Sequence, residues 1–91
     1  MLTRDQLDAV TSEQLRAARA MLRWDQSMLS DRSEVSLPTI KRLEGKFGRL
    51  HANPSTMRAI VVALESAGVT LLERTDDGPG VRIRQNHNER K

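Results

Sequence analysis

The strongest constraint on the fold is a pair of short helices that must follow each other through a very tight turn. Asp25 can cap a helix over residues 26–32, and Ser36 can cap a second helix whose first turn contains Pro38. Residues 33–35, which lie between the two, leave room for a turn and little else. The sequence therefore predicts two short helices joined by a turn.

A longer helix precedes this pair. It starts at Thr11, which can cap it because the Gln14 side chain, three residues further on, can reach back to the cap amide. It is predicted to end at Trp24. Arg16 is expected to face solvent, whereas Arg19 lies at the edge of the apolar side and needs a partner if it is covered. The apolar side follows the spacing of a core-facing helix and contains Leu15, Ala18, Met21 and Leu22.

A further helix follows the pair after a loop over residues 45–53. Asn53 is a suitable N-cap, Pro54 suits the first helical position, and Gly68 suits the position just past the end. The apolar residues of this helix again share one side, which contains Met57, Ile60, Val61 and Leu64. These signals predict a mainly α domain over residues 11–68.

The helix that starts after Ser36 has two contrasting sides. Its predicted core-facing side contains Ile40, Leu43 and Phe47. Its outer side is basic and slim, and contains Pro38, Lys41, Arg42, Gly45 and Lys46. Such a helix suits the major groove of DNA, which is about 12 Å wide. The alternative is that the same charges only keep an exposed helix solvated.

After Gly68 the apolar pattern changes from helical to alternating. The segments VTLLE and VRIR, with residues 75–80 between them, predict a β-hairpin over residues 69–84. An isolated two-stranded hairpin is marginally stable in water, so this one must pack on the helices or pair with a second copy. The candidate dimer-interface residues are Leu72, Val81 and Ile83, although a single exposed leucine is common and needs no partner.

The composition narrows the possible functions. The 91 residues are enough for one small domain, and a net charge of +3 favours an anionic partner. The sequence contains no cysteine, which excludes disulfides and thiolate chemistry. Neither His51 nor His87 has a second metal ligand at helical spacing. Because there is also no nucleophile elbow and no phosphate-binding glycine loop, we expect no enzyme activity, no metal and no cofactor.

The two ends of the chain are predicted to be peripheral. Residues 1–10 indicate a short helix or an arm, and residues 85–91 have nothing to bury and predict a disordered tail. The first of these segments carries charges where a signal peptide needs an apolar run. No segment reaches the roughly 20 apolar residues that span a bilayer. We therefore expect a cytoplasmic protein without a membrane partner.

Three segments together resemble a family of DNA-binding proteins. The runs ARAMLRWDQSML, EVSLPTIKRLE and MRAIVVALESAGV resemble the helix-turn-helix transcriptional regulators of the Cro/CI, or XRE, type over residues 11–68. The run GPGVRIR resembles, more loosely, the end of small bacterial members. The resemblance implies a mainly α fold of four to five helices with a C-terminal β-hairpin.

The resemblance also implies a function. Such proteins bind double-stranded DNA sequence-specifically as homodimers on near-palindromic operators, and they act on the nucleoid in the cytoplasm. The recognition helix, which enters the major groove, corresponds to residues 37–46. The competing interpretation is a protein-interaction module, such as an antitoxin or an anti-repressor, that contacts its partner through the hairpin or the tail.

Individual roles follow from the same resemblance. Base reading falls to Leu37, Pro38 and Arg42, and the Arg42 guanidinium can donate two hydrogen bonds to one guanine. Arg19 and Glu44, which border the apolar sides of two packed helices, are expected to form a structural ion pair. Phosphate binding falls to Gln26, Ser36, Thr39, Lys41, Lys46 and Arg49. For Gln26 the alternative is an exposed polar residue in the first turn of its helix.

Two features depart from the family pattern. Glu34 stands where the turn usually has glycine, and a side chain in a left-handed conformation costs on the order of 1 kcal/mol. The loop over residues 46–53 is longer than is typical, which either places Arg49 and His51 beside the DNA backbone or has no functional consequence. We expect such a contact for Arg49 and none for His51.

Overall fold

The computed structural model describes residues 6–7 and 9–84 of the chain. This part of the chain is mainly helical, with four helices and one antiparallel hairpin of two strands, which confirms the predicted order of elements. The predicted tail at 85–91 lies outside the described residues, as does most of the predicted helix or arm at 1–10. The elements are α2 (Ser12–Met21), α3 (Gln26–Ser33), α4 (Leu37–Glu44), α5 (Pro54–Ser66), β1 (Val69–Thr75) and β2 (Gly78–Ile83).

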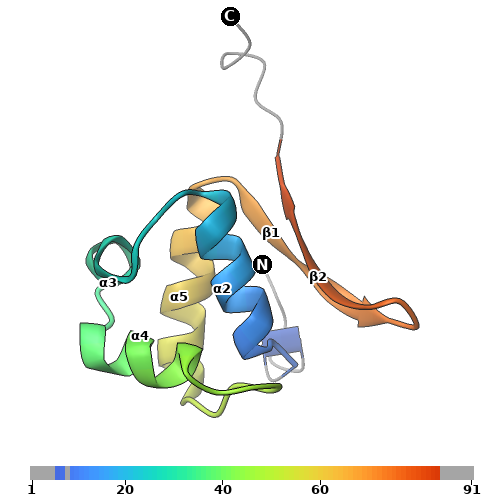
Figure 1. Ribbon diagram of the computed structural model, residues 1–91, viewed down its shortest axis with the longest axis horizontal. Helices are drawn as coiled ribbons and strands as arrows, with labels where there is room; N and C mark the ends of the chain where they lie inside the picture. The colour runs from blue at the N-terminus through green and yellow to red at the C-terminus, as the bar shows by residue number, and fades with distance from the viewer. Residues whose placement is uncertain (1–5, 8, 85–91) are drawn as a thin grey trace, which may run out of the picture.

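The helices surround one apolar core. Figure 1 shows α3 and α4 at one side of the molecule, and the hairpin extends beyond the helices at the opposite side. α3 packs against α4 and α5, α2 contacts α4 and both strands, and α5 leads directly into β1. Leu7 and Val10, which precede α2, are also buried. The most completely buried apolar residues are Leu15, Ala18, Leu29, Ile40, Leu43, Ile60, Val61, Leu64 and Val69.

The predicted caps start the helices where the sequence places them. Thr11 and Gln14 form the capping box of α2, and the Asp25 side chain accepts a hydrogen bond from the Met28 amide at 2.8 Å. The Ser36 hydroxyl accepts from the amide of Thr39 at 3.4 Å. Each cap satisfies an amide that the first turn of its helix cannot, which explains why short helices such as α3 and α4 have defined starts.

α2 ends earlier than predicted. Its last residue is Met21, with Leu22 as the C-cap, whereas the sequence suggested an end at Trp24. The reason is that Arg23 adopts a left-handed conformation with φ of 58°, which a helix cannot continue through. The Trp24 amide still donates to the Arg19 carbonyl, so the chain stays close to the helix end as it passes to α3.

The turn between α3 and α4 contains a residue other than glycine, Glu34, in a left-handed backbone conformation. Glu34 has φ of 62° and ψ of 20°. Hydrogen bonds on both sides fix it: the Glu34 amide donates to the Ser30 carbonyl at 2.8 Å, and the Ser30 hydroxyl donates to the Val35 carbonyl at 2.6 Å. The turn therefore keeps a conformation that favours glycine because its neighbours hold it there.

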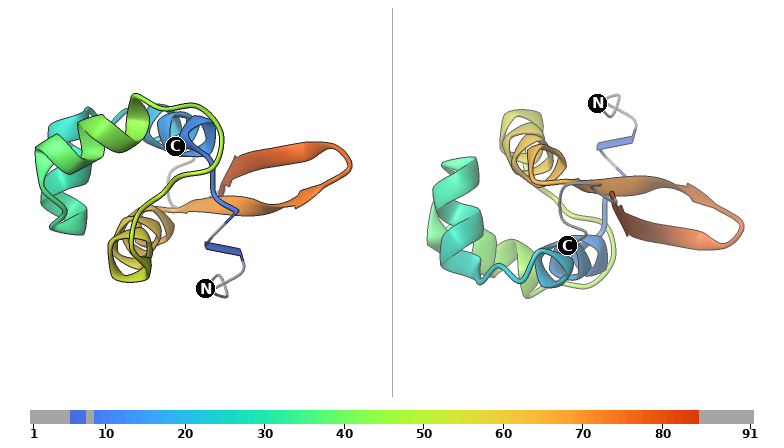
Figure 2. Two further views of the ribbon diagram at one scale, coloured as in Figure 1. Left: turned by 90° about the horizontal axis from the view of Figure 1, so that it is seen from below. Right: turned by 90° about the horizontal axis from the view of Figure 1, so that it is seen from above.

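The hairpin is joined to α2 at an irregularity in its ladder. Leu71 pairs with Val81 and Leu72 with Gly80, after which the register shifts before the Asp76 and Asp77 turn. The predicted turn over residues 75–80 is thus shorter than expected. At the last regular pair, the Gln14 side-chain amide donates to the Leu72 carbonyl at 3.1 Å and to the Gly80 carbonyl at 2.9 Å. The first turn of α2 thereby anchors the hairpin, whose tip extends into solvent (Figure 2).

Candidate nucleic-acid interface

The outer side of α4 carries positive charge and little bulk. Ile40 and Leu43 are buried beneath it, whereas Pro38, Lys41 and Arg42 are exposed. Leu37 and Thr39, at the start of the helix, are half-buried. The predicted base-reading residues Leu37, Pro38 and Arg42 therefore belong to the accessible part of α4.

The one acidic residue of α4 points inward. Glu44 is only 4% exposed, and its carboxylate accepts two hydrogen bonds from Arg19, at 2.7 Å from Nε and 2.8 Å from Nη2. Arg19 also donates to the Trp24 carbonyl at 2.8 Å. The hydrogen bonds that Arg19 donates to the Glu44 carboxylate raise the pKa of Arg19 against the opposing effect of burial. This pair joins α2 to α4 and leaves the outer side of α4 without a negative charge.

Gln26 belongs to the same polar cluster. Its Nε2 donates to the Glu44 Oε1 at 3.0 Å, and the residue is half-buried rather than fully exposed. One amide hydrogen is therefore engaged within the protein. The predicted phosphate contact of Gln26 depends on the second hydrogen of that amide group.

The start of α4 presents two hydroxyl groups. The Ser36 hydroxyl donates to the Thr39 hydroxyl at 2.9 Å, while it accepts from the Thr39 amide. Because Ser36 uses its hydrogen on Thr39, the Thr39 hydroxyl hydrogen is the one available to an anionic acceptor. Both residues were predicted to bind phosphate, and this arrangement favours Thr39 as the donor.

α4 ends earlier than the predicted recognition helix at 37–46. Its last residue is Glu44 and Gly45 is its C-cap. Arg16 supplies donors to the end of the helix: its Nη1 lies 3.0 Å from the Lys46 carbonyl and 2.8 Å from the Ser12 hydroxyl, and it also donates to the Glu44 carbonyl. Arg16 was expected to face solvent; its side chain is 35% exposed, and its guanidinium also contacts the end of α4. A guanidinium at the end of a helix satisfies carbonyls that have no partner within the helix.

Phe47 was predicted to face the core, and this is wrong. It is 84% exposed, because the chain leaves the helix at Gly45 and the helical spacing from Ile40 and Leu43 no longer applies. The Phe47 ring lies 5.7 Å from the guanidinium carbon of Arg16. The two glycines that flank this segment, Gly45 and Gly48, are the signal that could have indicated the change of direction.

The loop after α4 is tied to the start of α2. The Gly48 amide donates to the Glu13 carboxylate at 3.0 Å, and the Gly48 carbonyl accepts from the Ser12 amide at 2.8 Å. The Leu50 amide donates to the Val10 carbonyl at 3.0 Å. Hydrogen bonds from the backbone amides of Glu13 itself and of Gly48 lower the pKa of the Glu13 carboxyl. The segment that carries Lys46 and Arg49 is thus held in a defined position beside α4.

Two hollows lie on different parts of the surface. One, of about 550 Å³, adjoins the end of α4 and is lined by Arg42, Leu43, Gly45, Lys46, Phe47, Arg49 and His51. The other, of about 580 Å³, lies between the end of α3 and α5 and includes Trp24, Arg58, Val62 and Arg32, whose guanidinium lies 5.1 Å from the Trp24 ring. The first hollow is continuous with the outer side of α4 and the second is separate from it.

The candidate dimer residues fall on both faces of the hairpin. Val81 packs against the core, and Ile83, which pairs with Val69, is 39% exposed. Leu72 points to the other face, where it lies over Gly80. Leu72 and Val81 are both half-buried, so Ile83 keeps the most surface available for a second copy.

Within residues 6–7 and 9–84 no helix is both long enough and apolar enough to cross a bilayer. The same residues contain no group of three or more histidine, aspartate or glutamate side chains arranged to hold a metal ion. No protein-family model matches the chain, and no curated protein is significantly similar to it.

Proposed function

We propose that the protein is a sequence-specific regulator of the Cro/CI helix-turn-helix type that binds double-stranded DNA as a homodimer. In this proposal α4 enters the major groove and the turn at Glu34 sets its angle to α3. Two copies would place their α4 helices about 34 Å apart on a near-palindromic site.

One observation carries the proposal: the acidic residue of α4 is buried, whereas its basic residues are exposed. Glu44 is neutralised by Arg19 beneath the helix, while Lys41 and Arg42 stand on the outer side. Lys46 adds a further exposed cation just beyond the helix end. A surface with this charge attracts the phosphate backbone, and Arg42 has the geometry to donate twice to guanine.

The shape of α4 supports the same conclusion. Gly45 carries no side chain, and the exposed Pro38 at the other end is compact and fixed in φ. A Cβ at Gly45 would lie 3.3 Å from the Lys41 carbonyl, so the backbone at this position is tightly turned as well as bare. A slim helix with two long cations can approach base edges more closely than one covered with large side chains.

The proposed dimer contact lies in the hairpin. β1 and β2 form a sheet of two strands whose outer edges pair with no other strand of the described chain. Leu72 and the exposed part of Ile83 provide apolar surface at these strands. Pairing with a second copy would cover strand edges that are otherwise open to unwanted association.

The decisive experiment is selection of bound sequences from a random duplex library. We expect enrichment of a two-fold symmetric motif, which would establish base reading and dimerisation together. Arg42→Ala should abolish the preference among sequences while leaving the circular dichroism spectrum and low-salt binding intact. Lys41→Ala is the matched control, because a phosphate contact should weaken binding to all sequences alike. Absence of any enriched motif would refute the proposal.

The second candidate function is a protein-interaction module such as an antitoxin or an anti-repressor. The hollow between the end of α3 and α5 favours it, because Val62 is 39% exposed there beside Trp24 and the cations Arg32 and Arg58. This combination suits a partner segment with apolar and acidic residues. Arg58→Glu separates the two functions: it should disrupt such a partner while leaving the enriched DNA motif unchanged.

A further inference from the structure

Phe47 is an exposed aromatic residue that stands between two hydrogen-bonded backbone groups, the Lys46 carbonyl and the Gly48 amide. Single exposed apolar side chains are common, so an exposure of 84% indicates little by itself. What distinguishes Phe47 is the guanidinium beside its ring, because Arg16 is itself fixed by hydrogen bonds to the Glu44 and Lys46 carbonyls. The chain on the other side of Phe47 is fixed by the Gly48 amide, which donates to Glu13. The backbone is therefore fixed on both sides of Phe47, and the ring lies beside Arg16 while it remains open to a ligand.

The surroundings of the ring are cationic. Phe47 lines the hollow at the end of α4 together with the cations Arg42, Lys46 and Arg49. Among the residues that the structure describes, no acidic one lines it. A ligand that fits here must carry negative charge and must also offer an apolar surface to the ring.

The dimensions of α4 indicate which part of DNA reaches this hollow. A helix of eight residues is about 12 Å long, which is close to the width of the major groove. When Leu37 and Pro38 at one end lie over base edges, the other end reaches the strand that borders the groove. That strand presents phosphates alternating with deoxyribose rings, which are the two kinds of surface that the hollow requires.

We propose that Phe47 packs against a deoxyribose of the DNA strand bordering the major groove, while the cations of the hollow bind the phosphates on either side of that sugar. This inference rests on the proposed DNA binding and adds a contact that carries no charge. The contact should contribute equally to the affinity for every DNA sequence, because deoxyribose is the same in each. It should not change the salt dependence of binding, because it releases no counterions.

The test uses the full chain and random-sequence duplexes of about 20 base pairs, roughly two helical turns. Phe47→Ala should bind these duplexes about tenfold more weakly, as expected for the loss of one buried aromatic contact. The slope of log K against log salt should not change. Lys46→Ala should instead reduce that slope by about 0.9, because it removes one phosphate contact.

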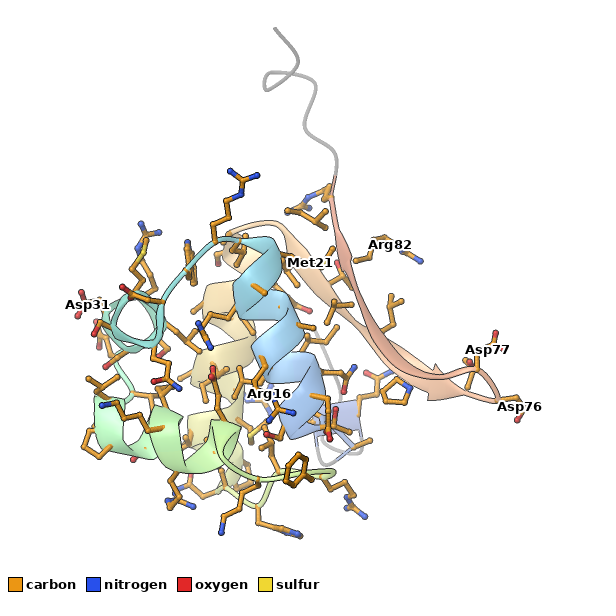
Figure 3. All side chains as sticks on the ribbon, viewed as in Figure 1. Arg16, Met21, Asp31, Asp76, Asp77 and Arg82 are labelled. Carbon is orange, nitrogen blue, oxygen red and sulfur yellow. The ribbon has the colours of Figure 1, made fainter. Side chains whose placement is uncertain are left out.

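Two controls separate the sugar contact from other effects. Inorganic polyphosphate carries the charge without the sugar, so Phe47→Ala should bind it as tightly as the parent protein does. Met21→Ala removes an apolar side chain that is 39% exposed, that does not line the hollow and that Figure 3 shows at the upper end of α2, above Arg16, so it should leave duplex binding unchanged. The thermal unfolding of Phe47→Ala should match that of the parent, because the ring contributes little to the core.

The possible results are distinct. Loss of affinity for duplex alone, at constant salt slope, supports the contact. Unchanged duplex affinity overturns it, and so does an equal loss on duplex and polyphosphate, which would mean that the ring only positions the cations. Either of these results leaves the proposed function intact. If the parent protein does not bind duplex even at low salt, both proposals fail.

Discussion

The Gln14 side chain donates a hydrogen bond to the Gly80 carbonyl at 2.9 Å and so joins the first turn of α2 to the hairpin. The same side chain accepts from the Thr11 amide at 3.0 Å through its oxygen. One amide group therefore caps a helix with one atom and anchors a distant strand with the other.

This double role leads to a test that separates the two contacts. Gln14→Glu keeps an oxygen for the Thr11 amide but replaces the donor with a carboxylate oxygen that faces the Leu72 and Gly80 carbonyls. We expect the free energy of unfolding to fall by about 2 kcal/mol, because two partly buried acceptors lose their donor. Urea denaturation measures the change. The helical circular dichroism of the folded state should be kept, and an unchanged urea midpoint would show that the hairpin does not depend on this contact.

The ion pair beneath α4 should be important for stability. Glu44→Ala leaves the Arg19 guanidinium and the Gln26 amide without their acceptor, and we expect a loss of about 3–5 kcal/mol of unfolding free energy. Thermal and urea unfolding measure it. The double variant Arg19→Met with Glu44→Leu removes both charges and should recover most of the loss. If the double variant is no more stable than Glu44→Ala, the cost does not come from an unpaired charge.

The left-handed turn predicts a stabilising substitution. Glu34→Gly removes the steric cost of a Cβ at φ of 62° and should raise the free energy of unfolding by about 0.5–1 kcal/mol, after the greater freedom of glycine in the unfolded chain is counted. Asp31→Gly, at an exposed helical position of α3, is the control and should lower it by a similar amount. A loss of stability in Glu34→Gly would mean that the Glu34 side chain contributes more than its backbone conformation costs.

Glu13 should make the stability depend on pH. Its pKa is lowered in the folded protein by the hydrogen bonds from its own amide and that of Gly48, so the folded state favours the charged form relative to the ordinary value of 4.5. The resulting stabilisation is present above that value and is lost as the pH falls through the lower folded pKa. The difference in unfolding free energy between the parent and Glu13→Gln should therefore shrink in acid. Urea titrations across this range test it, with Glu65→Gln as a charge-matched control. If the difference in unfolding free energy between the parent and Glu13→Gln does not change with pH, the Glu13 carboxylate does not contribute to stability in this way.

The helices were predictable because their signals are local. Thr11 with Gln14, Asp25, Ser36, and Asn53 with Pro54 each lie within one turn of the helix that they start. The alternating pattern after Gly68 likewise indicated the hairpin. At the helix starts and in the hairpin, interactions among a few neighbouring residues are enough to determine the local structure.

The surroundings of α4 depend on contacts that no local pattern encodes. Arg16 contacts the carbonyls of Glu44 and Lys46 because the fold brings the end of α4 beside α2, and Gln14 meets Gly80 only after the hairpin has packed against α2. Phe47 was predicted to face the core because it continues the helical spacing of Ile40 and Leu43. The helix ends before Phe47, with Gly45 as its C-cap, so that spacing does not apply to it. A helical periodicity places side chains only as far as the helix continues.

The hydrogen bonds that tie Gly48 to Glu13 and to Ser12 have a thermodynamic consequence for any ligand at the end of α4. A flexible loop must lose conformational entropy when it closes on a partner, and that loss subtracts from affinity. Here folding has already fixed the segment between Lys46 and Arg49, so little entropy remains to be lost at the moment of contact. The affinity of this surface should accordingly reflect the contacts themselves, with only a small penalty for ordering the protein.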